Sequence, residues 1–133
     1  MRRPLVLKPG EGRDYPLGLM TAVFKADGAE TTGAYSVSEW ILQPHSPGPG
    51  EHSHPDADDV FYVLEGVVTF ILDGAAQDVA AGGFVLAAAG VRHDFENRTD
   101  KPARLLNFYS GEFEKDMPMI AAWYRDNPAK PLE

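Results

Sequence analysis

Residues 52–66 read HSHPDADDVFYVLEG, and this segment carries the strongest structural signal of the chain. It begins with two histidines on either side of one serine and continues into an apolar run, 59–64, typical of a β-strand. Because side chains alternate along an extended backbone, His52 and His54 are expected to lie on one face. Asp59 opens the following strand, so its carboxylate can close toward the two imidazoles.

A second segment, residues 82–97, reads GGFVLAAAGVRHDFEN and places His93 on a separate predicted strand. Imidazoles are the commonest side-chain ligands of borderline divalent metals, and a carboxylate adds charge neutralisation. Three nitrogens and one oxygen would leave open positions on an octahedral ion. A closed structural zinc site uses four ligands, usually with cysteine, and this chain has no cysteine. A metal held by these residues is therefore expected to be accessible to a substrate.

The two segments together resemble the paired motifs of the cupin family. The first motif reads His-x-His, three or four residues, Glu, six residues, Gly, and it is similar to the run from His52 to Gly66. The second reads Gly, five residues, Pro-x-Gly, two residues, His, three residues, Asn, and it is similar to the run from Gly82 to Asn97. The resemblance implies a cupin double-stranded β-helix, a jelly-roll barrel, with one divalent ion per chain: Fe, Mn, Ni, Co or Zn. It also implies the metal ligands, which are His52, His54, Asp59 and His93.

Three positions depart from the motifs. Asp59 replaces the Glu of the first motif and Ala88 replaces the Pro of the second. Ser46 occupies the position of a glycine that precedes His-x-His in the first motif. Aspartate is one methylene shorter, about 1.5 Å, so the Asp59 contact can be direct, through water or absent. That freedom makes Asp59 the candidate catalytic base as well as a ligand. Asp58 is kept as an alternative ligand, and His45 is interpreted as a loop residue.

The remaining sequence predicts one all-β domain over residues 1–133 with a short C-terminal helix. Thirteen glycines and eleven prolines are spread along the chain and separate short apolar segments, as in sandwiches and barrels. Residues 1–20 are expected to form an irregular arm, and residues 116–127 a helix that Asp116 caps and Asn127 ends. Strands are expected over 21–25, 34–42, 59–64, 67–72, 77–80, 83–87, 92–97 and 103–109.

Composition excludes several partners. The net charge is -8, so neither a nucleic-acid backbone nor an anionic membrane surface is an expected partner. No apolar run approaches the roughly 18 residues of a membrane-spanning helix, and no signal-type segment follows the basic N-terminus. We therefore expect a cytoplasmic protein. Trp40, Trp123 and Tyr124, taken as exposed aromatics, and the small size of the barrel favour a homodimer.

The expected pocket holds a small-molecule substrate. Phe61, Val63 and Phe95 share strand faces with the candidate ligands, and an apolar cavity beside an open metal face suits an aromatic or enolic compound. The resemblance is to small quercetinase-like dioxygenases, which makes a metal-dependent oxygenase the first hypothesis. A metal-dependent isomerase or cyclase of polyketide-type substrates and a non-catalytic metal- or ligand-binding module remain the alternatives.

Overall fold

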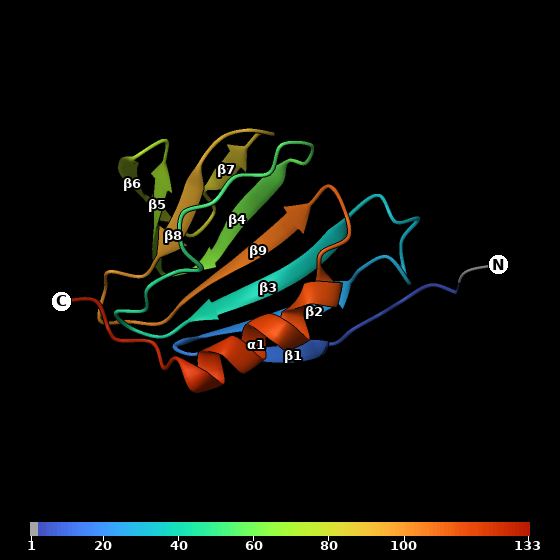
Figure 1. The fold of residues 1–133 in the computed structure, drawn as a ribbon, viewed down its shortest axis with the longest axis horizontal. Helices are drawn as coiled ribbons and strands as arrows, with labels where there is room; N and C mark the ends of the chain where they lie inside the picture. Colours follow the sequence, from blue (N-terminus) through green and yellow to red (C-terminus); the bar gives the residue numbers. More distant parts are fainter. Residues whose placement is uncertain (1–2) are drawn as a thin grey trace.

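The computed structural model describes residues 3–133 and contains two antiparallel sheets and a C-terminal helix (Figure 1). The larger sheet has the strand order β1-β2-β3-β9-β4-β7, and the smaller sheet has the order β6-β5-β8. The strands are β1 (Arg13–Leu17), β2 (Met20–Ala26), β3 (Ser36–Leu42), β4 (Asp59–Glu65), β5 (Val67–Leu72), β6 (Ala75–Ala80), β7 (Phe84–Ala87), β8 (His93–Glu96) and β9 (Ala103–Tyr109). A short 3-10 turn, η1 (Glu114–Asp116), leads into α1 (Met117–Asp126).

The expected all-β barrel is confirmed, and the predicted strands agree with the observed ones to within two residues at each end. The expectation of an irregular arm over 1–20 is wrong at Arg13–Leu17, which form β1 and pair with β2. Pro16 is tolerated there because β1 is an edge strand, where a missing N–H breaks no ladder. Residues 1 and 2 lie outside the described residues. The turn Asp73-Gly74 joins β5 and β6 with positive φ at both positions, as a tight hairpin requires.

The core lies between the two sheets. Alternate residues of β4 and β9 point inward, and the rings of Phe61, Phe70 and Phe95 meet with centres 5.2 to 6.1 Å apart. Gly48 in the long loop before β4 passes against β8, since a Cβ built there would lie 1.5 Å from the carbonyl oxygen of Phe95. Only glycine allows this approach, which holds the histidine-bearing loop against the small sheet.

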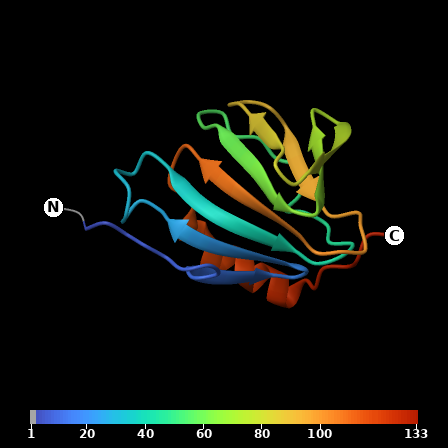
Figure 2. The same cartoon turned by 180° about the vertical axis from the view of Figure 1, so that it is seen from behind.

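The helix covers the part of the large sheet that the small sheet leaves open. Figure 2 shows α1 behind β1 and β2, and Met117 and Ala121 of the helix are buried in the same core cluster as the strands. Asp116 occupies the N-cap position, but its side chain makes no capping hydrogen bond to residues 3–133, so that expectation is corrected. Asn127 ends the helix as expected. Among residues 3–133, no helix has the length and apolar character needed to cross a membrane.

An ion pair fastens the start of this helical segment to β1. The guanidinium of Arg13 donates to both carboxylate oxygens of Glu114 at 2.6 and 2.7 Å, and the hydroxyl of Tyr15 donates to the same carboxylate at 2.7 Å. The hydrogen bond to Glu114, together with burial, raises the pKa of Tyr15 to about 12. The start of the helical segment is thereby held against β1 of the large sheet.

Candidate metal centre

The loop histidine His52 and the strand histidine His93 are fixed to each other through their backbones. The N–H of His52 donates to the carbonyl of His93 at 3.0 Å, and the N–H of His93 donates back at 2.8 Å. This single antiparallel bridge ties the loop to the start of β8. It sets the two imidazole rings side by side, with centres 4.3 Å apart.

Backbone carbonyls also orient these two imidazoles. Nδ1 of His52 donates to the carbonyl of Gly50 at 2.7 Å, and Nδ1 of His93 donates to the carbonyl of Val91 at 2.8 Å. A metal-ligating histidine commonly donates its other ring nitrogen in this way, because the bond sets the tautomer and the ring direction. In both residues Nε2 is the nitrogen left to face the centre.

Asp59 forms a hydrogen bond with His93 and lies close to His54, so its shorter side chain reaches the histidines. Its Oδ2 is 2.9 Å from Nε2 of His93 and 3.4 Å from Nε2 of His54. Burial acts to lower the pKa of His93, but the hydrogen bonds to Asp59 and to the Val91 carbonyl, with nearby carboxylate charge, outweigh it and raise that pKa. The alternative ligand Asp58 points away, since its carboxylate accepts the N–H of Ala89 at 2.9 Å.

His54 supplies the observation that bears most directly on a metal. Its Nε2 is buried and has no hydrogen-bond partner among the described residues 3–133. Burial, which the charge of Asp59 only partly offsets, lowers the pKa of His54 and favours the neutral imidazole that coordinates a cation. Leaving a buried nitrogen without a partner costs about 1–3 kcal/mol of folding free energy. Coordination of a metal ion by this nitrogen would remove that cost.

The four candidate ligands offer donor atoms that all lie within 4.8 Å of one another: His52, His54, Asp59 and His93. Three imidazole nitrogens and one carboxylate oxygen form a donor set suited to Fe, Mn, Co, Ni or Zn. The convergence of these atoms and the orphaned nitrogen of His54 fit a single divalent ion. These residues could therefore hold a metal.

Asn107 is a site residue that the sequence reasoning missed. It lies on β9 and is buried, and its Nδ2 donates to Oδ1 of Asp59 at 2.5 Å and to the carbonyl of Val60 at 3.1 Å. The alternation of side chains along this strand could have revealed it, because Asn107 occupies an inward position in line with Ala103 and Leu105. A polar residue at a core-facing position of a strand calls for a partner.

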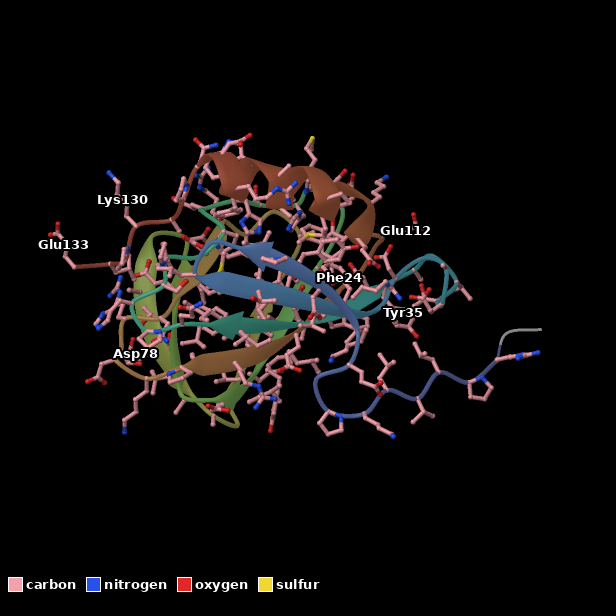
Figure 3. The ribbon with its side chains drawn as sticks, turned by 90° about the horizontal axis from the view of Figure 1, so that it is seen from below. Phe24, Tyr35, Asp78, Glu112, Lys130 and Glu133 are labelled. Carbon is pink, nitrogen blue, oxygen red and sulfur yellow. The ribbon has the colours of Figure 1, made fainter. Side chains whose placement is uncertain are left out.

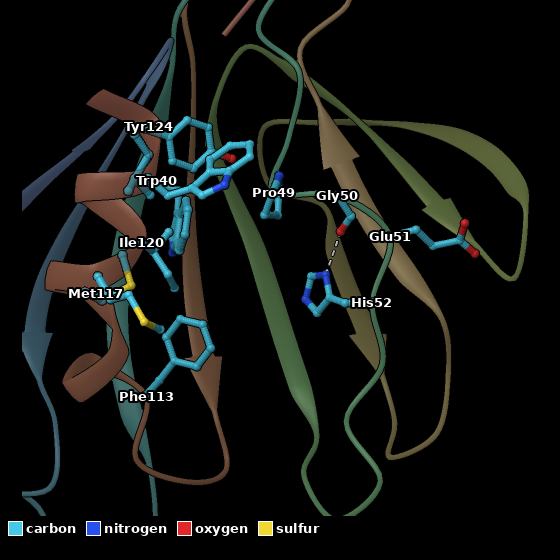
Figure 4. Close-up of a pocket in the computed structure, with 12 residues that line it drawn as sticks. Trp40, Pro49, Gly50, Glu51, His52, Phe113, Met117, Ile120 and Tyr124 are labelled. Carbon is cyan, nitrogen blue, oxygen red and sulfur yellow. Dashed lines mark hydrogen bonds between the residues drawn. The ribbon is translucent and has the colours of Figure 1, made fainter. Parts of the chain in front are cut away.

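An apolar cavity of about 530 Å³ adjoins this centre through His52 (Figure 4). It lies between α1 and the loop of residues 49–52, over Trp40 of β3. Trp40 is only 6% exposed, and Trp123 and Tyr124 line the cavity. The expectation of three exposed aromatics is thus corrected for Trp40, which is buried, and for Tyr124, which is half-buried, whereas Trp123 is exposed as expected.

The predicted pocket residues Phe61, Val63 and Phe95 lie in the core and not along this cavity. They are 2%, 0% and 3% exposed. The reason is that they sit where the two sheets face each other and pack closely. The cavity opens farther along the large sheet, where α1 takes the place of the small sheet.

Other residues in and near the two motifs contact the protein and not the candidate centre. Asn97 is buried, and its amide donates to the carbonyls of Gln43 and Lys101 at 3.1 and 2.7 Å. Glu51 and Arg92 form an exposed pair at 2.7 Å. His45 lies in the loop, as expected, and adopts a positive φ of 59°.

A match to a family model, together with the barrel and the site, assigns the chain to a protein family. The sequence model described as Cupin domain matches residues 38–109, which is more than half of the 133-residue chain. The chain belongs to the cupin family.

The chain is similar in sequence to one curated relative and in fold to two solved structures described here. The chain is 27% identical over 111 residues to a quercetin 2,3-dioxygenase of Bacillus subtilis (strain 168), covering 80% of this chain and 31% of the relative, so it spans about a third of that protein. An RmlC-like cupin from Shewanella frigidimarina superposes with a TM-score of 0.71 at 16% identity, over 86% of this chain and 96% of the other. A predicted oxalate decarboxylase from Thermotoga maritima gives 0.64 at 20% identity, over 69% and 80%. These two structures share the fold.

Proposed function

We propose that this protein is a mononuclear metal-dependent oxygenase that acts on an aromatic or enolic small molecule. The observation that carries the proposal is the shared position of His52, which contributes both to the candidate metal centre and to the wall of the apolar cavity. A substrate in the cavity would therefore present one edge to the centre. Apolar pockets with a few convergent polar groups are the usual form of a small-molecule site.

The chain's own residues would hold the metal ion and accept a proton from the substrate. His52, His54, His93 and Asp59 would hold the ion, which when bound supplies Lewis-acid and redox chemistry. Asp59 would also accept a proton from a substrate hydroxyl, and Asn107 holds its Oδ1 so that Oδ2 faces the imidazoles.

The cavity walls favour a flat apolar substrate. Trp40 and Phe113 lie on one side with the helix residues Met117, Ile120 and Tyr124, opposite Pro49 and His52 (Figure 4). Aromatic rings interact well with a stacked or edge-on planar ligand. A volume of about 530 Å³ lies within the range of drug-sized ligand pockets.

The curated relative supports oxygen chemistry over the alternatives. Its printed activity is a dioxygenase reaction on quercetin, a property of that protein, and the similarity extends over 80% of this chain. The isomerase or cyclase alternative would use the same Asp59 as base without consuming oxygen. Oxygen consumption is therefore the property that separates the two.

The test is oxygen uptake by untagged protein loaded in turn with Fe²⁺, Mn²⁺, Co²⁺, Ni²⁺ and Zn²⁺, with flavonols and other enols as substrates. We expect uptake with a redox-active ion and none with Zn²⁺. The double variant His54→Ala/His93→Ala is the control and should consume no oxygen. Substrate conversion without uptake would overturn the oxygenase proposal in favour of an isomerase or cyclase, and ligand binding without conversion would favour a binding module.

A further inference from the structure

His54 differs from the other two histidines of the candidate centre in how its ring is held. Nδ1 of His52 and Nδ1 of His93 each donate to a backbone carbonyl. His54 makes no such bond to a carbonyl of residues 3–133, and its Nε2 has no partner there. A side chain without hydrogen bonds can turn about its own bonds, and ordering it on binding an ion costs free energy. Another contact must therefore set the direction of this imidazole.

The ring of Tyr109 supplies that contact. Tyr109 is the last residue of β9 and lies in register with Asp59 of β4. It occupies the same inward-facing series of positions as Asn107. Its ring centre is 4.8 Å from that of His54, and the two planes meet at 72°, which is an edge-to-face arrangement. Ring pairs of this geometry attract each other beyond the area that they bury, so the contact favours one orientation of the imidazole.

Two neighbours along the chain fix the ring of Tyr109 in turn. The ring of Phe113 lies 5.3 Å away between centres, at an angle of 57°. Gly111 runs against the edge of the tyrosine ring, since a Cβ built on Gly111 would lie 2.9 Å from Cε2 of Tyr109. An approach this close would force the ring to move, so the glycine leaves the space that the ring occupies.

Phe113 is itself held firmly by β2 and by the loop that follows it. Its N–H donates to the carboxylate of Asp27 at 2.9 Å. Its ring stacks on the buried Phe24, with centres 6.2 Å apart and planes 8° apart. A packed series of rings therefore runs from the core through Phe113 and Tyr109 to His54.

We propose that Tyr109 is a positioning residue for the metal centre, and that its ring holds the imidazole of His54. In this orientation Nε2 of His54 stays buried beside the carboxylate of Asp59. A ligand that is already ordered loses less freedom when the ion binds, and the affinity is correspondingly higher. The proposal rests on the metal centre of the proposed function and assigns the contact that prepares one of its ligands.

Calorimetric titration of the metal-free protein with Zn²⁺ tests the role of the ring. Tyr109→Leu keeps an apolar side chain but removes the ring, and it should weaken binding roughly 5-fold. Tyr109→Phe keeps the ring and should bind Zn²⁺ as the wild type does. The visible spectrum of the Co²⁺ form reports the ligand geometry, and it should change in Tyr109→Leu but not in Tyr109→Phe.

Tyr35→Leu is the matched control, because it removes a tyrosine ring that packs on another aromatic residue away from the centre. Tyr35 stacks on Phe108 with ring centres 5.2 Å apart, and it lies beside the outlying N-terminal segment (Figure 3). The Tyr35→Leu protein should keep the wild-type affinity for Zn²⁺ and the wild-type Co²⁺ spectrum.

Gly111→Ala tests the same contact without removing the ring, and it keeps the test decisive if Tyr109→Leu folds poorly. The added Cβ should displace the ring of Tyr109 and weaken Zn²⁺ binding, in the same direction as Tyr109→Leu. The metal-free protein gives a second measurement by NMR. The ring protons of His54 should give sharp signals in wild type and Tyr109→Phe, and broadened signals in Tyr109→Leu and Gly111→Ala.

The possible failures are distinguishable from one another. Wild-type Zn²⁺ affinity and Co²⁺ spectra in both Tyr109→Leu and Gly111→Ala would overturn the positioning role and leave the metal centre intact. An equal loss of affinity in Tyr109→Phe and Tyr109→Leu would assign the effect to the hydroxyl and refute the role of the ring. A wild-type protein that binds no divalent ion would refute the metal centre, and with it both this proposal and the proposed function.

Discussion

The side-chain amide of Asn107 on β9 donates to Oδ1 of Asp59 on β4 at 2.5 Å, across 48 residues of sequence. The opposite oxygen of the same carboxylate lies 2.9 Å from Nε2 of His93. The amide therefore occupies one side of Asp59 and leaves the other side to the histidines. Hydrogen bonds of this kind behind a ligand set its direction and its basicity.

Asn107→Ala should weaken metal binding about 10-fold, because Asp59 loses the partner that orients it. Calorimetric titration of the metal-free protein with Zn²⁺ measures the affinity, and the visible spectrum of the Co²⁺ form reports the ligand geometry. Gln77→Ala on the exposed strand β6 is the control. An Asn107→Ala protein with unchanged affinity and an unchanged Co²⁺ spectrum would show that the amide has no influence on the centre.

The three imidazoles should contribute more to metal retention than the carboxylate. Elemental analysis should find no retained metal in the double variant His54→Ala/His93→Ala and a partial loss in Asp59→Ala, since three histidines alone can hold an ion. Asp59→Glu keeps a carboxylate in the site and should keep the metal. Unchanged stoichiometry in the double variant would show that the ligand assignment is wrong.

The His93–Asp59 pair should make the stability of the metal-free protein depend on pH. The folded pKa of His93 is raised above its ordinary value of 6.5, so the paired imidazolium stabilises the fold fully below that pH. This contribution, about 1 kcal/mol, should be lost as the pH rises through the folded pKa. Urea unfolding of wild type and Asp59→Asn between pH 6 and 9 should show a difference that shrinks with increasing pH. A difference that grows with pH would contradict the prediction.

Trp123→Ala should weaken binding of an aromatic ligand several-fold without changing metal content. Trp123 lines the cavity but is 58% exposed, so its removal costs the fold little. Fluorescence titration with a flavonol gives the affinity, and elemental analysis gives the metal content. If affinity stays at the wild-type value, the ligand does not contact this wall of the cavity.

Asn97→Ala should destabilise the protein by about 3 kcal/mol, because several buried polar groups lose their partner together. The Asn97 amide donates to the carbonyls of Gln43 and Lys101, and its oxygen accepts from Thr99. Urea unfolding measures the change, with Gln77→Ala again as the surface control. A loss below about 1 kcal/mol would mean that water replaces these contacts.

Short-range spacing in the sequence, together with the resemblance to the two cupin motifs, was enough to name the four residues whose donor atoms the structure brings together. The alternation of side chains along a strand places His52 with His54, and Asp59 with Phe61, on shared faces. The short apolar segments between glycines and prolines predicted the strands and the all-β fold. These features depend only on neighbouring residues, so they can be read without knowing which strands pair.

Strand pairing and helix docking decided the rest. Asn107 reaches Asp59 because β9 pairs with β4, and no local pattern specifies that pairing. Trp40 became a cavity wall because α1 docks across the open part of the sheet, while Phe61 and Phe95 became core because the second sheet covers them. The sequence by itself determined which side chains share a strand face. Only the tertiary structure decided what lies opposite each face, because those contacts join segments far apart in the chain.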